Sequence, residues 1–333
     1  MYVIKNSVSV FEDNNNIILN DTINNKVYRI LGLDSESKNI IYSLLNNKKE
    51  NLSSYENNKK YDKVLSILKS KDMIIENYDN NYIETMYEKQ VDFFSDFLDN
   101  PNTIPNMLNN KKVVIIGLGG VGCIAIQHLL SCGVSKFILI DPDYVSESNL
   151  NRQFCYTQKQ VGKSKVDAMK DYIKSTGINI SASYFKKFVD SETSLEDMLI
   201  NEGKIDFILV CADTPAVKIR NYILNYAIKQ NIPLSFVGIG VYDGFWGPLI
   251  DSTRNMKNFY NYNEQILNSE FNNLKGIVSS SIGFTNSIIS SYFVKDIIMY
   301  LSGVKDIPSK NKLLQLNFKT NKISEILDIS KEI

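Results

Sequence analysis

The sequence has 333 residues, of which 44% are hydrophobic and 22% charged, and its formal net charge is zero. This balance gives no sign of a nucleic acid or a membrane surface as the partner. The length allows one large domain and one small one, because single domains usually hold about 100–200 residues.

The cysteines are scattered, and no two of them have the C-x-x-C spacing of a metal site or redox pair. They are Cys123, Cys132, Cys155 and Cys211. We therefore expect no disulfide framework and no zinc, and a reducing cytoplasm as the location. The N-terminus lacks a basic segment followed by an apolar one, and no stretch of about 18 apolar residues is uninterrupted, so we expect neither a signal peptide nor a membrane span.

Residues 1–80 read as a small α+β module. Short runs at 2–10, 16–20 and 26–31 are rich in Val, Ile and Tyr and are separated by Asp/Asn clusters, which predicts a small antiparallel sheet. Helical patterns follow from Ser35 and from about Tyr61. This order of elements predicts a winged-helix-like module, which the Asn/Asp-rich stretch 77–81 links to the rest.

Winged-helix modules often bind DNA, but the charge of this one argues against that. Residues 1–100 contain twelve Lys/Arg and sixteen Asp/Glu, whereas a DNA-reading domain normally carries a basic face. An exposed strand of the small sheet is better suited to accept an extended peptide by strand addition.

From Lys111 onward, buried strands alternate with helices. The strands are VVIIG, FILID, DFILVCAD and PLSFVGIG, and the helices lie near 121–132, 163–175 and 215–229. This alternation predicts an α/β fold with a Rossmann-like, mostly parallel sheet over residues 81–333.

A glycine motif follows the first of these strands. Gly117, Gly119 and Gly122 form G-x-G-x-x-G between a strand and a helix, and Asp141 ends the next strand, 19 residues after Gly122. Glycines let the backbone approach phosphates at a helix N-terminus, and an acid at this position holds ribose hydroxyls. The pattern predicts a nucleotide site rather than a purely structural turn.

The residues that follow Asp141 suit a triphosphate better than the diphosphate of a dinucleotide. Arg152 and Lys165 are two cations within one segment, and Asp213 closes a later strand, where it could hold Mg²⁺ between phosphates. Each also has a simpler interpretation: the two cations could be solvated surface charges, and Asp213 could cap the helix that follows Pro215.

Taken together, several motifs resemble the ThiF/MoeB/HesA superfamily of adenylating enzymes, and most closely the MccB-like peptide adenylyltransferases of microcin C maturation. They are GLGGVG at 117–122, ILIDPD at 138–143, SNLNRQ at 148–153, VGKSK at 161–165, CADTP at 211–215 and the step around Trp246-Gly247-Pro248-Leu249. The resemblance covers about residues 85–325.

The resemblance implies ATP and Mg²⁺ as cofactors and adenylation of a carboxylate as the reaction. It implies that Gly117, Gly119, Gly120 and Gly122 lie at the nucleotide, that Asp141 binds the ribose, and that Arg152 and Lys165 contact the triphosphate. Asp213 would coordinate magnesium, and Asn149 and Gln153 would shape the pocket.

The same resemblance implies that the N-terminal module holds a ribosomal precursor peptide, and that the enzyme is a homodimer in which each subunit lends a basic residue to the other's site. The position of that residue matches Lys89, where the family usually has arginine; lysine supplies charge without the planar fork. The C-x-x-C pairs that hold zinc in many relatives are absent. No cysteine follows residue 225, so a thioester mechanism is not expected.

Two later segments remain open. Phe245 and Trp246 could line the substrate pocket or belong to the core. Residues 252–276 have weak periodicity, and we expect a mobile lid or a peptide-contacting loop there.

The sequence therefore predicts an ATP-dependent enzyme that activates a carboxyl group of a ribosomal peptide, without nucleic acid or membrane partners. Two alternatives are activation of a Gly-Gly sulfur-carrier protein and a non-catalytic subunit that presents a leader peptide. The retained phosphate-site residues favour catalysis.

Overall fold

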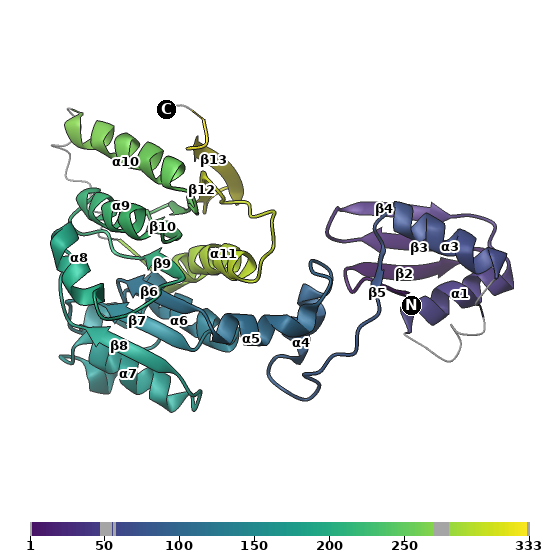
Figure 1. The fold of residues 1–333 in the computed structure, drawn as a ribbon, viewed down its shortest axis with the longest axis horizontal. Coiled ribbons are helices and arrows are strands. Elements are labelled where there is room, and N and C mark those ends of the chain that lie inside the picture. Colours follow the sequence, from purple (N-terminus) through teal and green to yellow (C-terminus); the bar gives the residue numbers. More distant parts are fainter. Residues whose placement is uncertain (1, 47–54, 56–57, 270–279, 332–333) are drawn as a thin grey trace. The chain divides into compact units, whose positions relative to one another are not determined.

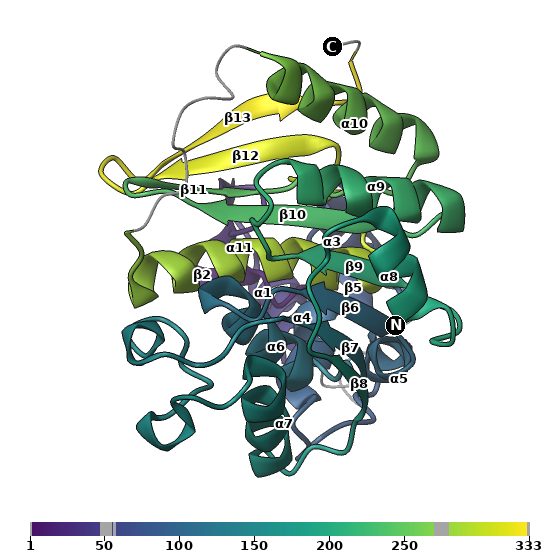
Figure 2. The same ribbon diagram turned by 90° about the vertical axis from the view of Figure 1, so that its left-hand side faces the viewer.

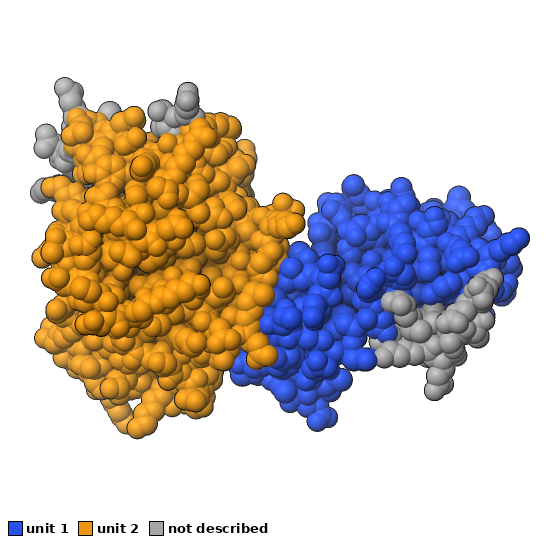
Figure 3. All heavy atoms as spheres, in the orientation of Figure 1, with its two compact units in different colours: residues 1–105 blue, residues 106–333 orange. Residues whose placement is uncertain are grey.

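The computed structural model describes residues 2–46, 55, 58–269 and 280–331. The chain divides into two compact units, residues 1–105 and residues 106–333 (Figure 3). No helix in these described ranges has both the length and the apolar composition needed to cross a bilayer.

The first unit contains two small sheets and several helices. Its elements are β1 (Tyr2–Ile4), β2 (Val8–Asp13), β3 (Asn16–Asp21), β4 (Lys26–Ile30), α1 (Ser35–Leu45), α3 (Lys59–Ser70), β5 (Ile74–Glu76), α4 (Glu88–Phe94) and the short η1 (Pro101–Thr103). Strands β2, β3 and β4 form an antiparallel sheet, and β1 pairs with β5. Helix α1 begins at the predicted Ser35, and α3 begins two residues before the predicted start near Tyr61. Asp34 and Asn58 fix these starts, because their side chains accept hydrogen bonds from first-turn N–H groups.

Our prediction of one strand over residues 2–10 was wrong. The chain turns between Lys5 and Val8, where the Val8 N–H donates to the Lys5 carbonyl. Strand β1 then pairs with β5, which the sequence did not reveal because three-residue strands carry too little pattern.

The segment after residue 80 is tied into this first unit. The Asp96 carboxylate accepts the backbone N–H groups of Asn6 and Ser7, at 3.0 and 2.7 Å. The unit therefore extends to Pro105, beyond the linker that the sequence suggested.

The second unit is built around one large sheet. Its strands are β6 (Lys112–Ile116), β7 (Lys136–Ile140), β8 (Ser181–Phe185), β9 (Phe207–Val210), β10 (Leu234–Ile239), β11 (Asp243–Trp246), β12 (Lys312–Asn317) and β13 (Lys322–Asp328). Its helical segments are α5 (Ile104–Asn109, which crosses the unit boundary), α6 (Gly120–Ser131), η2 (Glu147–Asn149), η3 (Gln158–Gln160), α7 (Lys165–Ser175), α8 (Glu192–Leu199), α9 (Lys218–Gln230), α10 (Thr253–Asn268) and α11 (Gly283–Leu301).

The eight strands run in the order β13-β12-β11-β10-β9-β6-β7-β8. Strands β10, β9, β6, β7 and β8 are parallel, and the remaining pairs are antiparallel. Helices α6 and α11 cover one face and α8 and α9 the other (Figures 1 and 2). The predicted Rossmann-like, mostly parallel fold is confirmed.

Strand order reverses next to β6, since β7 lies on one side of it and β9 on the other. At such a point the connecting helices diverge to opposite faces and leave a crevice at the carboxyl ends of the strands, where ligands bind in open α/β sheets.

The expected lid over residues 252–276 was wrong for the part that the structure describes, because residues 253–268 form helix α10. Ser252 caps its start, and Met256 and Phe259 are buried against the sheet. Most residues of this helix are polar, several of them asparagines, so the segment resembled a loop although its few apolar residues lie on one side. Residues 270–276 lie outside the described residues.

Trp246 belongs to the core. Its side chain is buried, its ring stacks on Tyr292 with centroids 4.8 Å apart, and its Nε1 donates to Asp296 Oδ2 at 3.2 Å. Of the two interpretations, the structure therefore favours a place in the core for Trp246.

Candidate nucleotide-binding site

The glycine loop between β6 and α6 is held in a turn that only glycine fits well. Gly117 has φ +97°, and a Cβ at this position would lie 2.8 Å from the Cys211 carbonyl and from the Ala212 nitrogen. A Cβ on Gly122 would collide with the Gly117 carbonyl oxygen. The loop thus brings the start of α6 against the ends of β6 and β9.

Helix α6 begins without a side-chain cap, because its N-cap residue is Gly119. The first N–H groups of a helix have no intrahelical partner, and together with the helix dipole they favour an anion. Gly117, Gly119 and Gly120 all line a cavity of about 370 Å³ at the carboxyl ends of β6, β7, β9 and β10. The cavity therefore has an anion-binding end at the glycine loop.

Asp141 directly follows β7, lies in the wall of this cavity and is almost fully buried. Its Oδ2 accepts the Leu118 N–H at 2.6 Å, and its Oδ1 accepts the Asp143 N–H at 2.8 Å. Burial raises the pKa of Asp141 above its ordinary value, and the charge of Lys165 and the two N–H donors partly oppose that shift. Asp141 thereby fixes the glycine loop, and each oxygen keeps acceptor capacity for a ribose hydroxyl.

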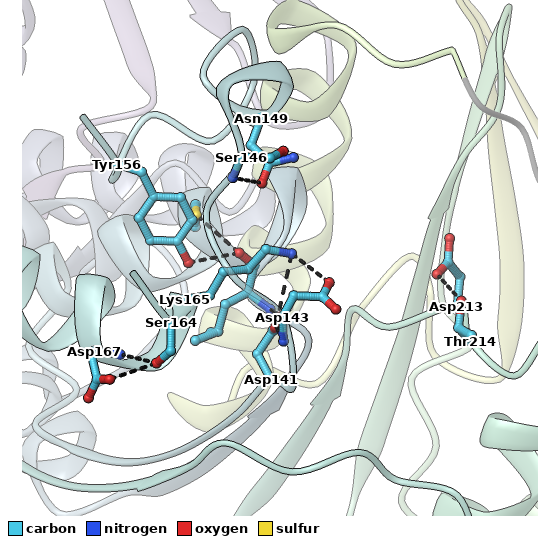
Figure 4. A network of polar contacts seen from close by, with 12 residues as sticks. Asp141, Asp143, Ser146, Asn149, Tyr156, Ser164, Lys165, Asp167, Asp213 and Thr214 are labelled. Atoms are coloured by element: carbon cyan, nitrogen blue, oxygen red, sulfur yellow. Dashed lines mark hydrogen bonds and ion pairs between the residues drawn. The ribbon is translucent and has the colours of Figure 1, made fainter. Parts of the chain in front are cut away.

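Tyr156 holds the same loop from the other side. Its hydroxyl donates to the Leu118 carbonyl at 3.0 Å (Figure 4). Burial raises the pKa of the Tyr156 phenol, so the hydroxyl stays a donor. Sequence reasoning missed this residue because a lone tyrosine in a loop carries no motif.

Lys165 is the first residue of α7 and is buried despite its charge. Its Nζ lies 2.8 Å from Asp143 Oδ2 and 3.9 Å from Asp141 Oδ1 (Figure 4). Buried charges need partners, and these two carboxylates supply them beside the cavity.

Arg152 also lines the cavity, and its Nη1 donates to the Ser148 carbonyl at 2.8 Å and to Asn151 Oδ1 at 2.9 Å. The segment before it is set by Asn149, whose Oδ1 accepts the Ser146 N–H at 3.1 Å. Asn149 is buried in this turn and is not among the residues that line the cavity.

Gln153 does line the cavity and is buried. Its Oε1 has no hydrogen-bond partner among the described residues. Buried polar atoms are normally satisfied, and an exception points to a missing ligand or water. Gln153 is therefore available to a bound molecule.

Asp213 follows β9 and lines the cavity with an exposed side chain, apart from the Asp141–Lys165–Asp143 group (Figure 4). Its Oδ1 accepts a hydrogen bond from the Thr214 hydroxyl at 3.1 Å. It does not cap a helix, since α9 begins at Lys218 after Val217. Within the described ranges, no group of three or more His, Cys, Asp and Glu side chains is placed to hold a metal.

Lys89 belongs to helix α4 of the first unit, whereas the cavity belongs to the second. Its Nζ lies 2.7 Å from Glu88 Oε1, and its side chain is 85% exposed. The hydrogen bond and charge of Glu88 raise the pKa of Lys89, which keeps it protonated.

The cavity residues that were not predicted include Asn286 on α11, and Lys187 and Phe188 after β8. Asn286 Nδ2 donates to Ser281 Oγ and to the Ile282 carbonyl, both at 2.7 Å, and its Oδ1 occupies the space that a Cβ on Gly120 would need. The sequence carried no signal for Asn286, because α11 contains several other polar residues, among them Thr285, Ser290 and Asp296. Lys187 and Phe188 carried none either.

A doubly wound sheet with a glycine loop, a buried acid and cations around one cavity defines a nucleotide-binding α/β protein of the Rossmann-like class. The sequence pattern of the ThiF family matches residues 87–332. The chain belongs to the ThiF family.

Known sequence relatives match parts of this chain. "Adenylyltransferase and sulfurtransferase UBA4" of Scheffersomyces stipitis is 30% identical over 118 residues, which are 35% of this chain and 25% of that protein. The molybdopterin-synthase adenylyltransferase of Escherichia coli is 34% identical over 127 residues, 38% of this chain and 49% of that protein. The matched segments thus span half or less of these relatives.

Solved structures share the fold over almost the whole chain. E. coli MccB with ATP has a TM-score of 0.77 at 20% identity, and the match covers 98% of this chain and 96% of that one. E. coli MccB with AMPCPP and MccA has a TM-score of 0.78 at 20% identity over the same shares. The likeness therefore includes both units of the present fold.

Proposed function

We propose that this protein is an ATP- and Mg²⁺-dependent adenylyltransferase that activates a carboxyl group, most simply the C-terminal one, of a ribosomally made peptide. The reaction would be a cytoplasmic step in maturing a peptide antibiotic or a related modified peptide. The observation that carries the proposal is the single cavity lined by the glycine loop, Arg152, Lys165 and Asp213.

The reaction follows from this set of groups. A peptide carboxylate oxygen attacks the α-phosphorus of ATP, the bond to the oxygen that bridges the α- and β-phosphates breaks, and pyrophosphate leaves with the electron pair. The product is an acyl-adenylate. A carboxylate is already ionised at neutral pH, so the protein needs no general base. Lys165, Arg152 and the N–H groups at the start of α6 neutralise and position the phosphate oxygens.

Asp213 suits magnesium. This ion keeps several waters and binds through one or two carboxylates together with substrate phosphates. An exposed carboxylate in the cavity meets that need without further protein ligands. When bound, the ion would offset the charge that develops on the leaving pyrophosphate.

The first unit would hold the peptide. The structural likeness to MccB covers 98% of the chain, and one of those MccB structures contains MccA. Strands β2 and β4 are the outer strands of the small sheet, and an outer strand can accept an extended peptide through main-chain hydrogen bonds. Tethering raises the effective concentration of the carboxyl group at ATP.

We also propose a homodimer in which Lys89 of one subunit reaches the cavity of the other. The exposed, protonated side chain of Lys89 supports this role, because phosphate oxygens can replace its solvent-exposed ion pair with Glu88. Trans contribution would make the isolated subunit inactive.

One alternative substrate is a sulfur-carrier protein. The relatives named as sulfurtransferase and molybdopterin-synthase adenylyltransferases favour a Gly-Gly sulfur-carrier protein as the substrate. The small N-terminal unit favours a peptide. A non-catalytic role in presenting a leader peptide fits less well, because Asp141, Arg152, Lys165 and Asp213 are all present at or near one cavity.

The test is pyrophosphate release from ATP and Mg²⁺. Purified protein is incubated with peptides encoded by short reading frames beside its gene, and separately with a carrier protein that ends in Gly-Gly. Release with a peptide and none with the carrier supports the proposal. Pyrophosphate release only with the carrier would identify the carrier, and not a peptide, as the substrate. ATP binding without release in either case would favour the non-catalytic role.

A further inference from the structure

We propose that Lys187 is a specificity-determining residue that donates a hydrogen bond to a ring nitrogen of the nucleobase, while Phe188 covers the face of the base. This inference rests on the proposed function only in taking ATP as the ligand.

The order of strands places Lys187 at the nucleoside end of the cavity. The phosphates belong at the glycine loop after β6, and the ribose belongs at Asp141 after β7. Strand β8 lies next to β7 on the side away from β6, and the Asp141 N–H donates to the Phe185 carbonyl at 3.1 Å. The next residues of the chain, Lys187 and Phe188, line the cavity. Two strand spacings, roughly 10 Å, thus separate them from the phosphate end.

The charges in the cavity point to Lys187 as an available donor. Three cationic side chains line the cavity. Lys165 is paired with Asp143, and Arg152 donates to Ser148 and Asn151. For the Lys187 ammonium, the described part of the chain offers no ion pair or hydrogen bond. Its neighbour Lys186 differs, since its Nζ bonds to the Tyr144 hydroxyl and lies 3.9 Å from the centroid of that ring.

Phe188 adds an apolar surface beside this ammonium. Its side chain is 42% exposed although it lines the cavity wall. An exposed aromatic ring stacks favourably on any base, whereas a charged donor selects among bases by their acceptors. Adenine has acceptors at N1, N3 and N7, so a lysine donor can recognise it without contacting the amino group.

The matched variants are Lys187→Met and Lys186→Met, which remove adjacent charges and keep similar side-chain bulk. Calorimetric titration of the full-length protein with ATP and Mg²⁺ should show a Kd about tenfold higher for Lys187→Met, because a hydrogen bond from a charged donor is lost. Lys186→Met should bind ATP as the unmodified protein does. Tripolyphosphate, which has no base, should bind the unmodified protein and both variants equally.

ATP analogues that lack one ring nitrogen identify the acceptor. The analogues are 1-deaza-, 3-deaza- and 7-deaza-ATP. One of them should bind the unmodified protein about tenfold more weakly than ATP does, and its affinity should be no lower for Lys187→Met than for the unmodified protein. In Lys187→Met, KM for ATP should rise, while kcat for pyrophosphate release at saturating ATP should stay close to that of the unmodified protein.

Unchanged ATP affinity in Lys187→Met would overturn the proposal, and so would an equal loss for ATP, all three analogues and tripolyphosphate, which marks a phosphate contact. These results are distinct from failure of the proposed function. That failure would appear as absent ATP binding or absent pyrophosphate release in the unmodified protein.

Discussion

The ammonium of Lys165 lies 2.8 Å from the carboxylate of Asp143, beside the cavity in which we place ATP. In the ligand-free chain this acid offsets a buried positive charge that would otherwise be costly. In the proposed complex a triphosphate would bring competing oxygens, so Lys165 would have a partner both before and after binding.

Replacing Lys165 with methionine should reduce pyrophosphate release by roughly 100-fold or more, because a fixed charge that stabilises the transferring phosphate is lost. The matched control is Lys163→Met, two residues earlier. Lys163 pairs with Asp171 at the surface and does not line the cavity, and surface pairs contribute little. Equal activity of the two variants would remove Lys165 from the phosphate site.

The buried carboxyl of Asp141 should titrate above the ordinary value of 3.8, because burial penalises its charged form. The folded state then holds a proton that the unfolded chain has already lost. The contribution of Asp141 to the free energy of unfolding therefore declines as pH rises from about 3.8 through the raised pKa.

Carbon NMR of aspartate-labelled protein, assigned with Asp141→Asn, can follow this carboxyl group directly. Removing the charge of Lys165 in Lys165→Met should move the Asp141 pKa still higher, because that charge opposes the effect of burial. A pKa that stays unchanged would mean that the two groups do not interact in solution.

The general plan of this site could be read from the sequence, but its local supports could not. The strand, the glycines and Asp141 follow each other within one βαβ unit, so sequence spacing fixes their arrangement. Tyr156, Lys187 and Asn286 reach the same loop or cavity from segments far apart in the chain. Their positions depend on how α11 and the loop after β8 pack, which local periodicity does not encode.

The misread segments have a similar cause. Helix α10 is rich in asparagine and other polar residues, so it resembled a loop, while β1 and β5 are each three residues long. The parallel strands were easier to find, because burial on both faces makes them continuously apolar.

Gly117 and Gly119, two of the glycines that line the cavity, should respond differently to replacement by alanine. Gly117→Ala should lower the free energy of unfolding by about 1–3 kcal/mol, because its φ of +97° is unfavourable for alanine and the new Cβ meets the backbone of Cys211 and Ala212. Gly119→Ala should cost far less, since its Cβ would lie 3.9 Å from Gln153 Nε2, an ordinary contact. Urea unfolding followed by fluorescence of Trp246, the only tryptophan, measures both.

Asp213→Ala should abolish pyrophosphate release and leave the thermal midpoint close to that of the unmodified protein. The side chain is exposed and accepts a hydrogen bond from the neighbouring Thr214 hydroxyl, so its loss removes little from the fold. Its loss does remove the proposed magnesium ligand. Asp213→Asn separates charge from shape, and measurable activity of this variant at raised Mg²⁺ would indicate that the ion is held mainly by phosphates and water.

Lys89→Ala should be inactive alone and regain activity when mixed with Asp213→Ala. In a mixed dimer, one of the two sites receives an intact Lys89 from the Asp213→Ala subunit and an intact Asp213 from the Lys89→Ala subunit. Random mixing of equal amounts makes half of the dimers mixed, with one working site of two, so about a quarter of the unmodified activity is expected if subunits exchange freely.

Mixing Asp213→Ala with Lys165→Met is the control, because both lesions lie in the same unit and no combination restores a site. Absence of rescue, once subunit exchange has been verified with differently tagged chains, would place Lys89 outside the shared site.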